Sequence, residues 1–173
     1  MLPLFAALLA GAAGVSGAAD AQVSNLPGVF QATCLDGQAK FRANELSAIT
    51  FDQLPAGLRA SLGQPASGKV WQLNGAGRSY LYMLDYGDGS ATGARVCGLA
   101  SDAIDLKSAG DMLEQRVTGN VERNRPRSAQ WLNAREGYVA TATTAAALNV
   151  LQISWMSEAT KAKAQEQVQQ LPR

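Results

Sequence analysis

Residues 70–99 read VWQLNGAGRSYLYMLDYGDGSATGARVCGL, and this stretch decides the fold. The hydrophobic period changes to two here, and the runs at 70–74, 79–86 and 95–99 have the pattern of β-strands. Asn74-Gly75 favours a tight hairpin turn between the first two runs, and Gly87-Asp88-Gly89 predicts another turn before the third. Consecutive strands joined by tight turns predict an antiparallel meander.

Two short helices are expected before the meander. Pro27 suits the first turn of a helix over 26–36, where apolar side chains then share one face. A second helix is expected over 54–62, because Leu recurs there at every fourth position. The segment 38–53 keeps no single period and receives no assignment.

The chain beyond the meander predicts one more helix and further strands. Ser108 and Asp111 have the spacing of a capping box, so a helix should begin there. A polar, basic loop is expected over 121–128, and the sequence shows no internal repeat. Further strands are expected at 130–134, 138–144 and 149–155.

This order of elements is typical of the α+β class. We expect an antiparallel sheet of about five to six strands, with helices packed on one face and one disulfide. A parallel α/β sheet is disfavoured, because the strands come in runs and are not separated by helices.

The chain has two cysteines, Cys34 and Cys97. Neither belongs to a C-x-x-C motif, and the chain has no His to complete a metal site. In an oxidising compartment such a pair predicts one disulfide, which would close a loop of about 60 residues and contribute about 4 kcal/mol. The bridge would join the first helix to the third strand.

Residues 1–21 predict a bacterial export signal. Residues 1–19 carry no charged side chain, and a small-residue step at Ala19-Asp20-Ala21 suits signal peptidase. An uncleaved anchor is the alternative, but its glycines would make a poor membrane-spanning helix. We therefore expect 22–173 to be a single soluble domain, periplasmic or secreted, with 158–173 as a polar helical tail that frays and with no membrane span.

Composition narrows the classes of function. The 15 Lys and Arg nearly balance the 14 Asp and Glu, which argues against nucleic acid as a partner. The absence of His removes Ser-His-Asp and Cys-His catalysis and His-ligated zinc. Neither G-x-S-x-G nor S-x-x-K occurs, so no catalytic residue, cofactor site or metal site is assigned.

Four acidic residues are the candidates for acid–base chemistry. Asp111 is better explained as a capping carboxylate, and Glu114 should face water. The other two, Asp102 and Asp105, follow the third strand.

A possible ligand face is formed by aromatic side chains. Tyr80, Tyr82 and Tyr86 alternate along one strand, and Trp71 stands on its neighbour. An exposed ladder of such rings could stack on sugar or peptide ligands. The alternative is a central strand whose Tyr face is roofed by helices.

Two further sequence motifs have both a functional and a structural explanation. Arg123, Arg125 and Arg127, with Arg116 upstream, could form an anion patch. A solvated loop is the favoured explanation, because Glu122 and Glu136 lie nearby in the sequence and dilute the positive charge. Residues 63–70 nearly match a phosphate-binding loop, but Val70 replaces the hydroxyl residue. Since this stretch would lie between a helix end and a strand, it predicts a simple connection.

These observations favour an exported, non-catalytic protein that binds a protein or a cell-envelope component. The alternative is a carboxylate-dependent hydrolase of envelope polysaccharide or peptidoglycan, which needs two acids facing each other across a pocket. An inhibitor or chaperone of another exported protein is a third hypothesis.

Overall fold

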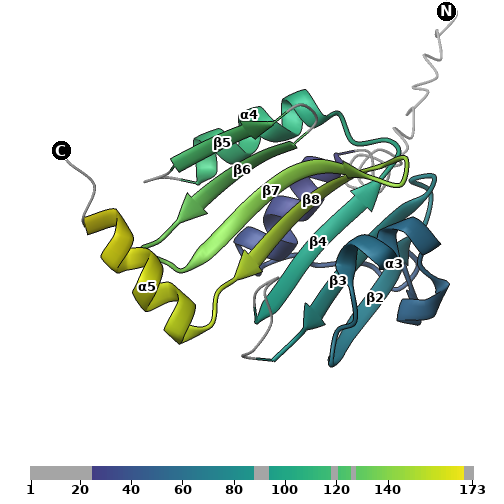
Figure 1. Ribbon diagram of the computed structural model, residues 1–173. Helices are drawn as coiled ribbons and strands as arrows, with labels where there is room; N and C mark the ends of the chain where they lie inside the picture. The colour runs from purple at the N-terminus through teal and green to yellow at the C-terminus, as the bar shows by residue number, and fades with distance from the viewer. Residues whose placement is uncertain (1–24, 88–93, 118–120, 126–127, 170–173) are drawn as a thin grey trace, which may run out of the picture.

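The described residues build one antiparallel sheet with helices on both faces. The computed structural model describes residues 25–87, 94–117, 121–125 and 128–169, so the expected signal at 1–21 lies outside it. Eight strands pair in the order β1-β2-β3-β4-β8-β7-β6-β5 (Figure 1). The α+β class is confirmed, and the strand number exceeds the expected five to six.

The strands are short and continuous. Their bounds are β1 Leu46–Ile49, β2 Ser67–Leu73, β3 Ser79–Asp85, β4 Arg95–Ser101, β5 Val121–Arg125, β6 Ser128–Asn133, β7 Tyr138–Ala145 and β8 Leu148–Trp155. The meander of β2, β3 and β4 is confirmed, as are the three expected strands that became β6, β7 and β8.

Both additional strands lie at the edges of the sheet. β1 falls in the segment without a period, and β5 replaces the expected loop at 121–128. β1 does not bury a full face, so it does not carry the alternation by which a strand is recognised in sequence. The side chains of β5 lie outside the described residues.

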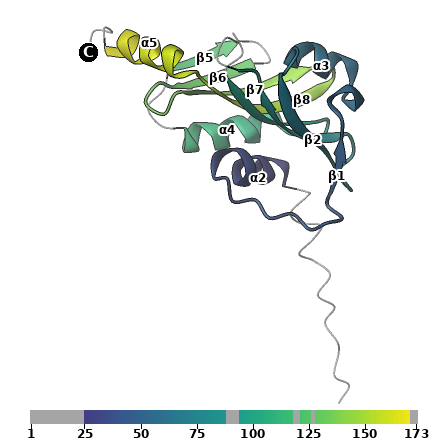
Figure 2. The same ribbon diagram turned by 90° about the horizontal axis from the view of Figure 1, so that it is seen from below.

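One face of the sheet is covered by two helical segments. Helix α2 (Leu26–Phe30) continues into the π-helical turn η1 (Gln31–Leu35), and α4 (Leu106–Arg116) lies beside it (Figure 2). Phe30 and Leu113 are fully buried here against strand residues such as Leu81. Asn25 caps α2 by accepting a hydrogen bond from the Gly28 amide at 3.1 Å.

Helix α3 corrects the expectation that all helices pack on one face. The 3-10 turn η2 (Phe51–Gln53) and α3 (Ala56–Leu62) lie on the opposite face of the sheet (Figure 2). There, Leu58 and Leu62 bury Tyr82 and Val150 in a second core. The centre of the sheet is apolar on both sides, so each side needs a cover.

The disulfide between Cys34 and Cys97 is confirmed. It joins η1 to the middle of β4, with the two Cα atoms 5.5 Å apart. Both cysteines are buried in the same core as Phe30. The bridge therefore holds the first helical segment against the sheet.

The strand order is palindromic about the pairing of β4 with β8, which we call the seam. Each half consists of a helix followed by a four-stranded meander: α2 with β1–β4, and α4 with β5–β8. Gly98 faces Gln152 at the middle of the seam. The halves differ in one connection, because residues 50–66 form η2 and α3 between β1 and β2, whereas only residues 126 and 127 join β5 to β6.

Helix α5 (Glu158–Gln169) follows β8 at the end of the described chain. Gln165 donates a hydrogen bond to the carbonyl of Arg135 at 3.4 Å, so this helix contacts the β6–β7 turn. Among the described residues, no helix has both the length and the apolar character needed to cross a membrane.

Candidate functional site

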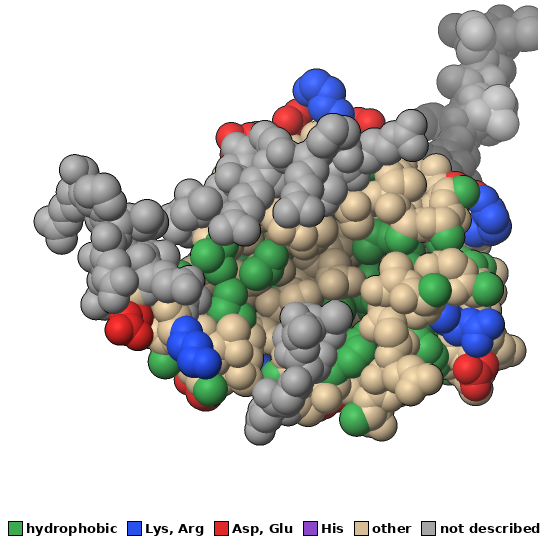
Figure 3. Space-filling view, viewed as in Figure 1, with side chains coloured by type: hydrophobic (Ala, Val, Ile, Leu, Met, Phe, Trp, Pro, Cys, Tyr) green, Lys and Arg blue, Asp and Glu red, His purple; other side chains and the backbone are tan. Residues whose placement is uncertain are grey.

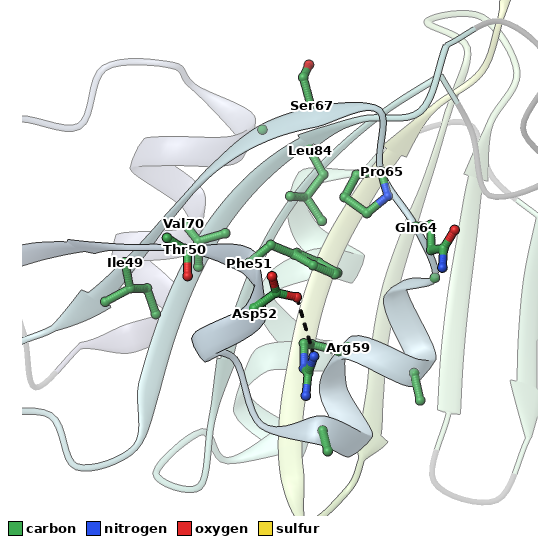
Figure 4. A pocket seen from close by; sticks show the side chains of 14 residues that line it. Ile49, Thr50, Phe51, Asp52, Arg59, Gln64, Pro65, Ser67, Val70 and Leu84 are labelled. Atoms are coloured by element: carbon green, nitrogen blue, oxygen red, sulfur yellow. Dashed lines mark hydrogen bonds and ion pairs between the residues drawn. The ribbon is translucent and has the colours of Figure 1, made fainter.

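The connection between β1 and β2 encloses a pocket of about 930 Å³ (Figure 4). One wall is η2 with α3, and the other is the beginning of β2. Its lining is contributed by Ile49, Thr50, Phe51, Asp52, Ala56, Arg59, Ala60, Gly63, Gln64, Pro65, Ser67, Gly68, Val70 and Leu84.

The floor of the pocket is apolar. Val70 and Leu84 are buried side chains of the sheet, and Phe51 lies over them from η2 (Figure 4). Phe51 is only half-buried, so its ring remains available to a bound molecule. Such a floor suits an apolar group about the size of one side chain.

Turn η2 is fixed by a local capping interaction. The Thr50 amide donates to Oε1 of Gln53 at 2.7 Å, and the Gln53 amide donates back to the Thr50 carbonyl at 3.1 Å. These reciprocal bonds satisfy amides that the short turn would otherwise leave unpaired. The position of Phe51 is therefore set before any ligand arrives.

Arg59 is the cation of the pocket. Its Nη1 lies 3.5 Å from Oδ1 of Asp52, whose side chain is 90% exposed, so this ion pair is weak. The Nε of Arg59 is buried and has no hydrogen-bond partner in the described part of the chain. The part of the guanidinium that an anionic oxygen could reach is the end paired with Asp52, because the Arg59 side chain is 38% exposed and this pairing is weak.

Gly68 forms part of the opposite wall. A Cβ atom at this position would lie 2.7 Å from Cδ2 of Leu84 and 2.7 Å from the carbonyl oxygen of Met83. Only glycine allows β2 to approach β3 this closely while Leu84 fills the floor.

No family model, no curated protein and no solved structure matches this chain. The function must therefore be argued from the geometry of the site.

The predicted tyrosines Tyr80, Tyr82 and Tyr86 share one face of the sheet, but they pack against the core beneath α3 and do not form an exposed ladder. Tyr82 is fully buried beneath α3, and the Tyr86 hydroxyl donates to the Leu62 carbonyl at 2.7 Å. Trp71 pairs with Leu81 and packs with the core on the other face of the sheet. The alternative explanation therefore holds. The helix predicted at 54–62 is α3, and it covers the sheet face that carries the tyrosines.

Burial controls the acidity of these phenols. Burial raises the pKa of Tyr86 to about 12. Burial, together with the nearby Tyr86, raises the pKa of Tyr82 still further. Both hydroxyls therefore stay protonated and act as hydrogen-bond donors throughout the neutral range.

The basic cluster is divided between two elements. Arg116 at the end of α4 places Nη2 3.1 Å from Oδ1 of Asp36. Arg123 and Arg125 lie on β5, opposite Gln130 and Ser128, and Arg127 lies outside the described residues. The side chains of Arg123 and Arg125 also lie outside the description, so an anion patch remains a prediction.

None of the four acidic candidates lines either of the two described pockets. Asp102 pairs with Arg78 at 3.1 Å, and Glu114 is exposed on α4, as expected. The predicted capping box is wrong, because α4 begins earlier, at Leu106. Asp105 caps it by accepting from the Ser108 amide at 3.0 Å, and Asp111 instead pairs with Lys107.

A second pocket of about 520 Å³ is lined by residues of β2, β3, β4 and β8, and it shares Gly68 and Leu84 with the first pocket. It includes Met83, which is 39% exposed, and Arg95, whose guanidinium lies 5.8 Å from the centre of the Trp155 ring. Its only carboxylate is Asp85, beside two cations, Lys69 and Arg95.

The sheet surface beyond α3 is open and polar. Gln152 and Thr141 are half-buried there, and Gln130 is exposed. Figure 3 shows this face hollowed between α3 and α5, with charged side chains at its margins. It is the counterpart, across the seam, of the surface that α3 covers.

Sequence reasoning missed Phe51, Arg59 and Gly68. Phe51 belongs to the segment without a period, and Arg59 is a polar position of a predicted amphipathic helix. Gly68 belongs to the stretch that nearly matches a phosphate-binding loop, and this stretch connects α3 to β2, as expected. The described residues include no cluster of three or more metal-ligating side chains.

Proposed function

We propose that this protein is an exported binding module for a protein or a cell-envelope component, with the pocket between α3 and β2 as its ligand site. The disulfide supports export, since such bonds form and persist in oxidising compartments. The predicted signal at 1–21 would deliver the chain there.

The observation that carries the proposal is the chemistry of the pocket. An apolar floor and a cation held only by a weak, exposed ion pair can bind and orient a ligand. The hydrolase alternative needs two carboxylates facing each other, and each of the two described pockets has one, Asp52 or Asp85. The site therefore favours binding over hydrolysis.

A matched pair of variants tests the proposal. Ala60 is exposed and lines the pocket, so Ala60→Trp would fill it without entering the core. Ala162→Trp makes the same change at an exposed position of α5. Residues 22–173, immobilised in oxidised form, should capture a defined component of envelope extract, and capture should fall at least ten-fold for the first variant alone.

Two results would contradict this function. Equal capture by both variants would exclude the pocket as the ligand site. A chain that stays full-length in the cytosol with two reactive thiols would exclude export.

A further inference from the structure

We propose that the pocket binds an extended peptide segment, which adds as a short strand beside Gly68 and places a carboxylate against Arg59. This inference rests on the proposed function, because it names the ligand class of the same site.

The first argument comes from the hydrogen-bonding pattern of β2. The Asn74 amide donates to the Glu45 carbonyl at 2.9 Å, so even-numbered residues of β2 direct their backbone groups toward β1. By the same alternation, Gly68 directs its N–H and C=O to that side.

The sheet has a gap at this position. The pairing of β1 with β2 ends at Ile49 and Val70, after which Thr50 leads the chain away into η2. The backbone of Gly68 is therefore left beyond the end of β1, and it is exposed and lines the pocket. A peptide that continues the line of β1 can exchange both hydrogen bonds with Gly68.

The second argument comes from the floor. A strand lying beside β2 directs alternate side chains to one face. On this face it would meet Phe51, Val70 and Leu84. One apolar side chain of the peptide can therefore be buried while its backbone pairs with Gly68.

The third argument comes from Arg59. Its side chain lines the pocket, is 38% exposed and pairs with Asp52 through Nη1. Because Asp52 is 90% exposed and 3.5 Å away, a peptide carboxylate can displace it at little cost. That carboxylate can be the chain terminus or an Asp or Glu side chain.

The test begins with selection from a random hexapeptide library displayed with a free carboxyl terminus. Oxidised residues 22–173 and the Ala60→Trp variant serve as parallel targets. We expect peptides with one apolar residue and a carboxylate to be enriched on the unmodified protein only. No enrichment over Ala60→Trp would overturn the peptide assignment.

Synthetic peptides then locate the contacts. In ¹⁵N spectra, an enriched peptide should shift both the Gly68 amide and the Arg59 Nε–H signal. If the carboxylate that contacts Arg59 is the chain terminus, amidation of the terminus weakens binding. If it is an Asp or Glu side chain, replacement of that side chain weakens binding. Decanoate is the non-peptide probe, and tighter binding of decanoate with no shift at Gly68 would overturn the inference.

Variants complete the test. Arg59→Gln should weaken peptide binding about ten-fold or more, since hydrogen bonds to charged groups are the stronger ones. Asp52→Asn should tighten it by releasing Arg59. Arg78→Gln, at an exposed arginine paired with Asp102 outside the pocket, should leave binding unchanged.

The two proposals fail separately. If no peptide binds but envelope capture still depends on Ala60, the peptide assignment falls and the binding function stands. If capture is also independent of Ala60, both fall.

Discussion

The hydroxyl of Tyr82 on β3 reaches across β4 and donates a hydrogen bond to Oε1 of Gln152 on β8, 3.0 Å away. The strand between them offers no side chain at the crossing point, because the residue there is Gly98. A Cβ at Gly98 would lie 2.3 Å from both Cζ and the hydroxyl oxygen of Tyr82. One glycine thus lets a tyrosine lie over the seam between the two halves.

Gly98→Ala should destabilise the protein by about 1–3 kcal/mol, because the Tyr82 ring must leave its place in the core. Urea unfolding measures the change. Gly110→Ala is the matched control: its nearest neighbour would be Cη2 of Trp131 at 3.9 Å, and it lies within α4. That variant should gain about 0.5–1 kcal/mol, and equal stability of the two variants would refute the argument.

Stability should fall as the pH rises above about 10. Burial raises the pKa of Tyr86 to about 12 and that of Tyr82 further, so the folded state holds these protons more tightly than the unfolded state. Their contribution is complete below the ordinary phenol pKa of about 10, and is lost as the pH rises toward and beyond 12. Urea midpoints at pH 8 to 11, with absorbance at 295 nm, would follow the loss. A Tyr82→Phe variant should show a shallower decline; an unchanged slope would contradict this cause.

Reduction of the disulfide should lower stability by about 4 kcal/mol, because Cys34 and Cys97 are 63 residues apart in sequence. Unfolding with and without reductant gives this difference, and Cys34→Ser with Cys97→Ser should reproduce it. Amide hydrogen exchange should rise first in α2 and η1, the segment that the bridge anchors. Uniform loss of protection across the sheet would contradict that assignment.

Asp105→Ala should lower the melting temperature more than Asp111→Ala does. Asp105 accepts from the Ser108 amide, the Ser108 hydroxyl and the Lys107 amide, whereas Asp111 makes one exposed ion pair. The Ser108 hydrogen bonds lower the pKa of Asp105, so its contribution is present at neutral pH and disappears as the pH falls below about 4. At pH 3 the two variants should therefore melt closer together, and a constant gap would contradict the capping role.

Period and turn chemistry were enough to predict the central strands. The strands around Leu81, Cys97 and Ile153 are buried on at least one face. Their sequences therefore show either alternating or continuous apolar residues, and both patterns are typical of strands. The disulfide was predicted from the expected oxidising compartment and from the presence of only two cysteines. The edge strand β1 could not be predicted, because its four residues are at most half-buried and show no alternation of burial. The strand β5 was missed because its sequence is polar and basic, which is typical of a loop.

The site was harder to predict than the fold. Its parts come from a turn, a helix and the first residues of a strand, and each has an ordinary local explanation. Phe51 and Arg59 become neighbours only because α3 folds back over the sheet. Gly68 matters because β1 ends before it can pair with this residue. The end of a strand is difficult to predict from the amino-acid sequence.

The palindromic order also determines how this chain can be divided. Cys34 and Cys97 both belong to the first half, so a cut after β4 separates no covalent partners. Two co-expressed fragments, severed between Ser101 and Leu106, would each keep a helix with its own meander and expose one complementary edge, β4 or β8. We expect such fragments to reassemble as a heterodimer, which makes this junction a suitable position for a split reporter of folding.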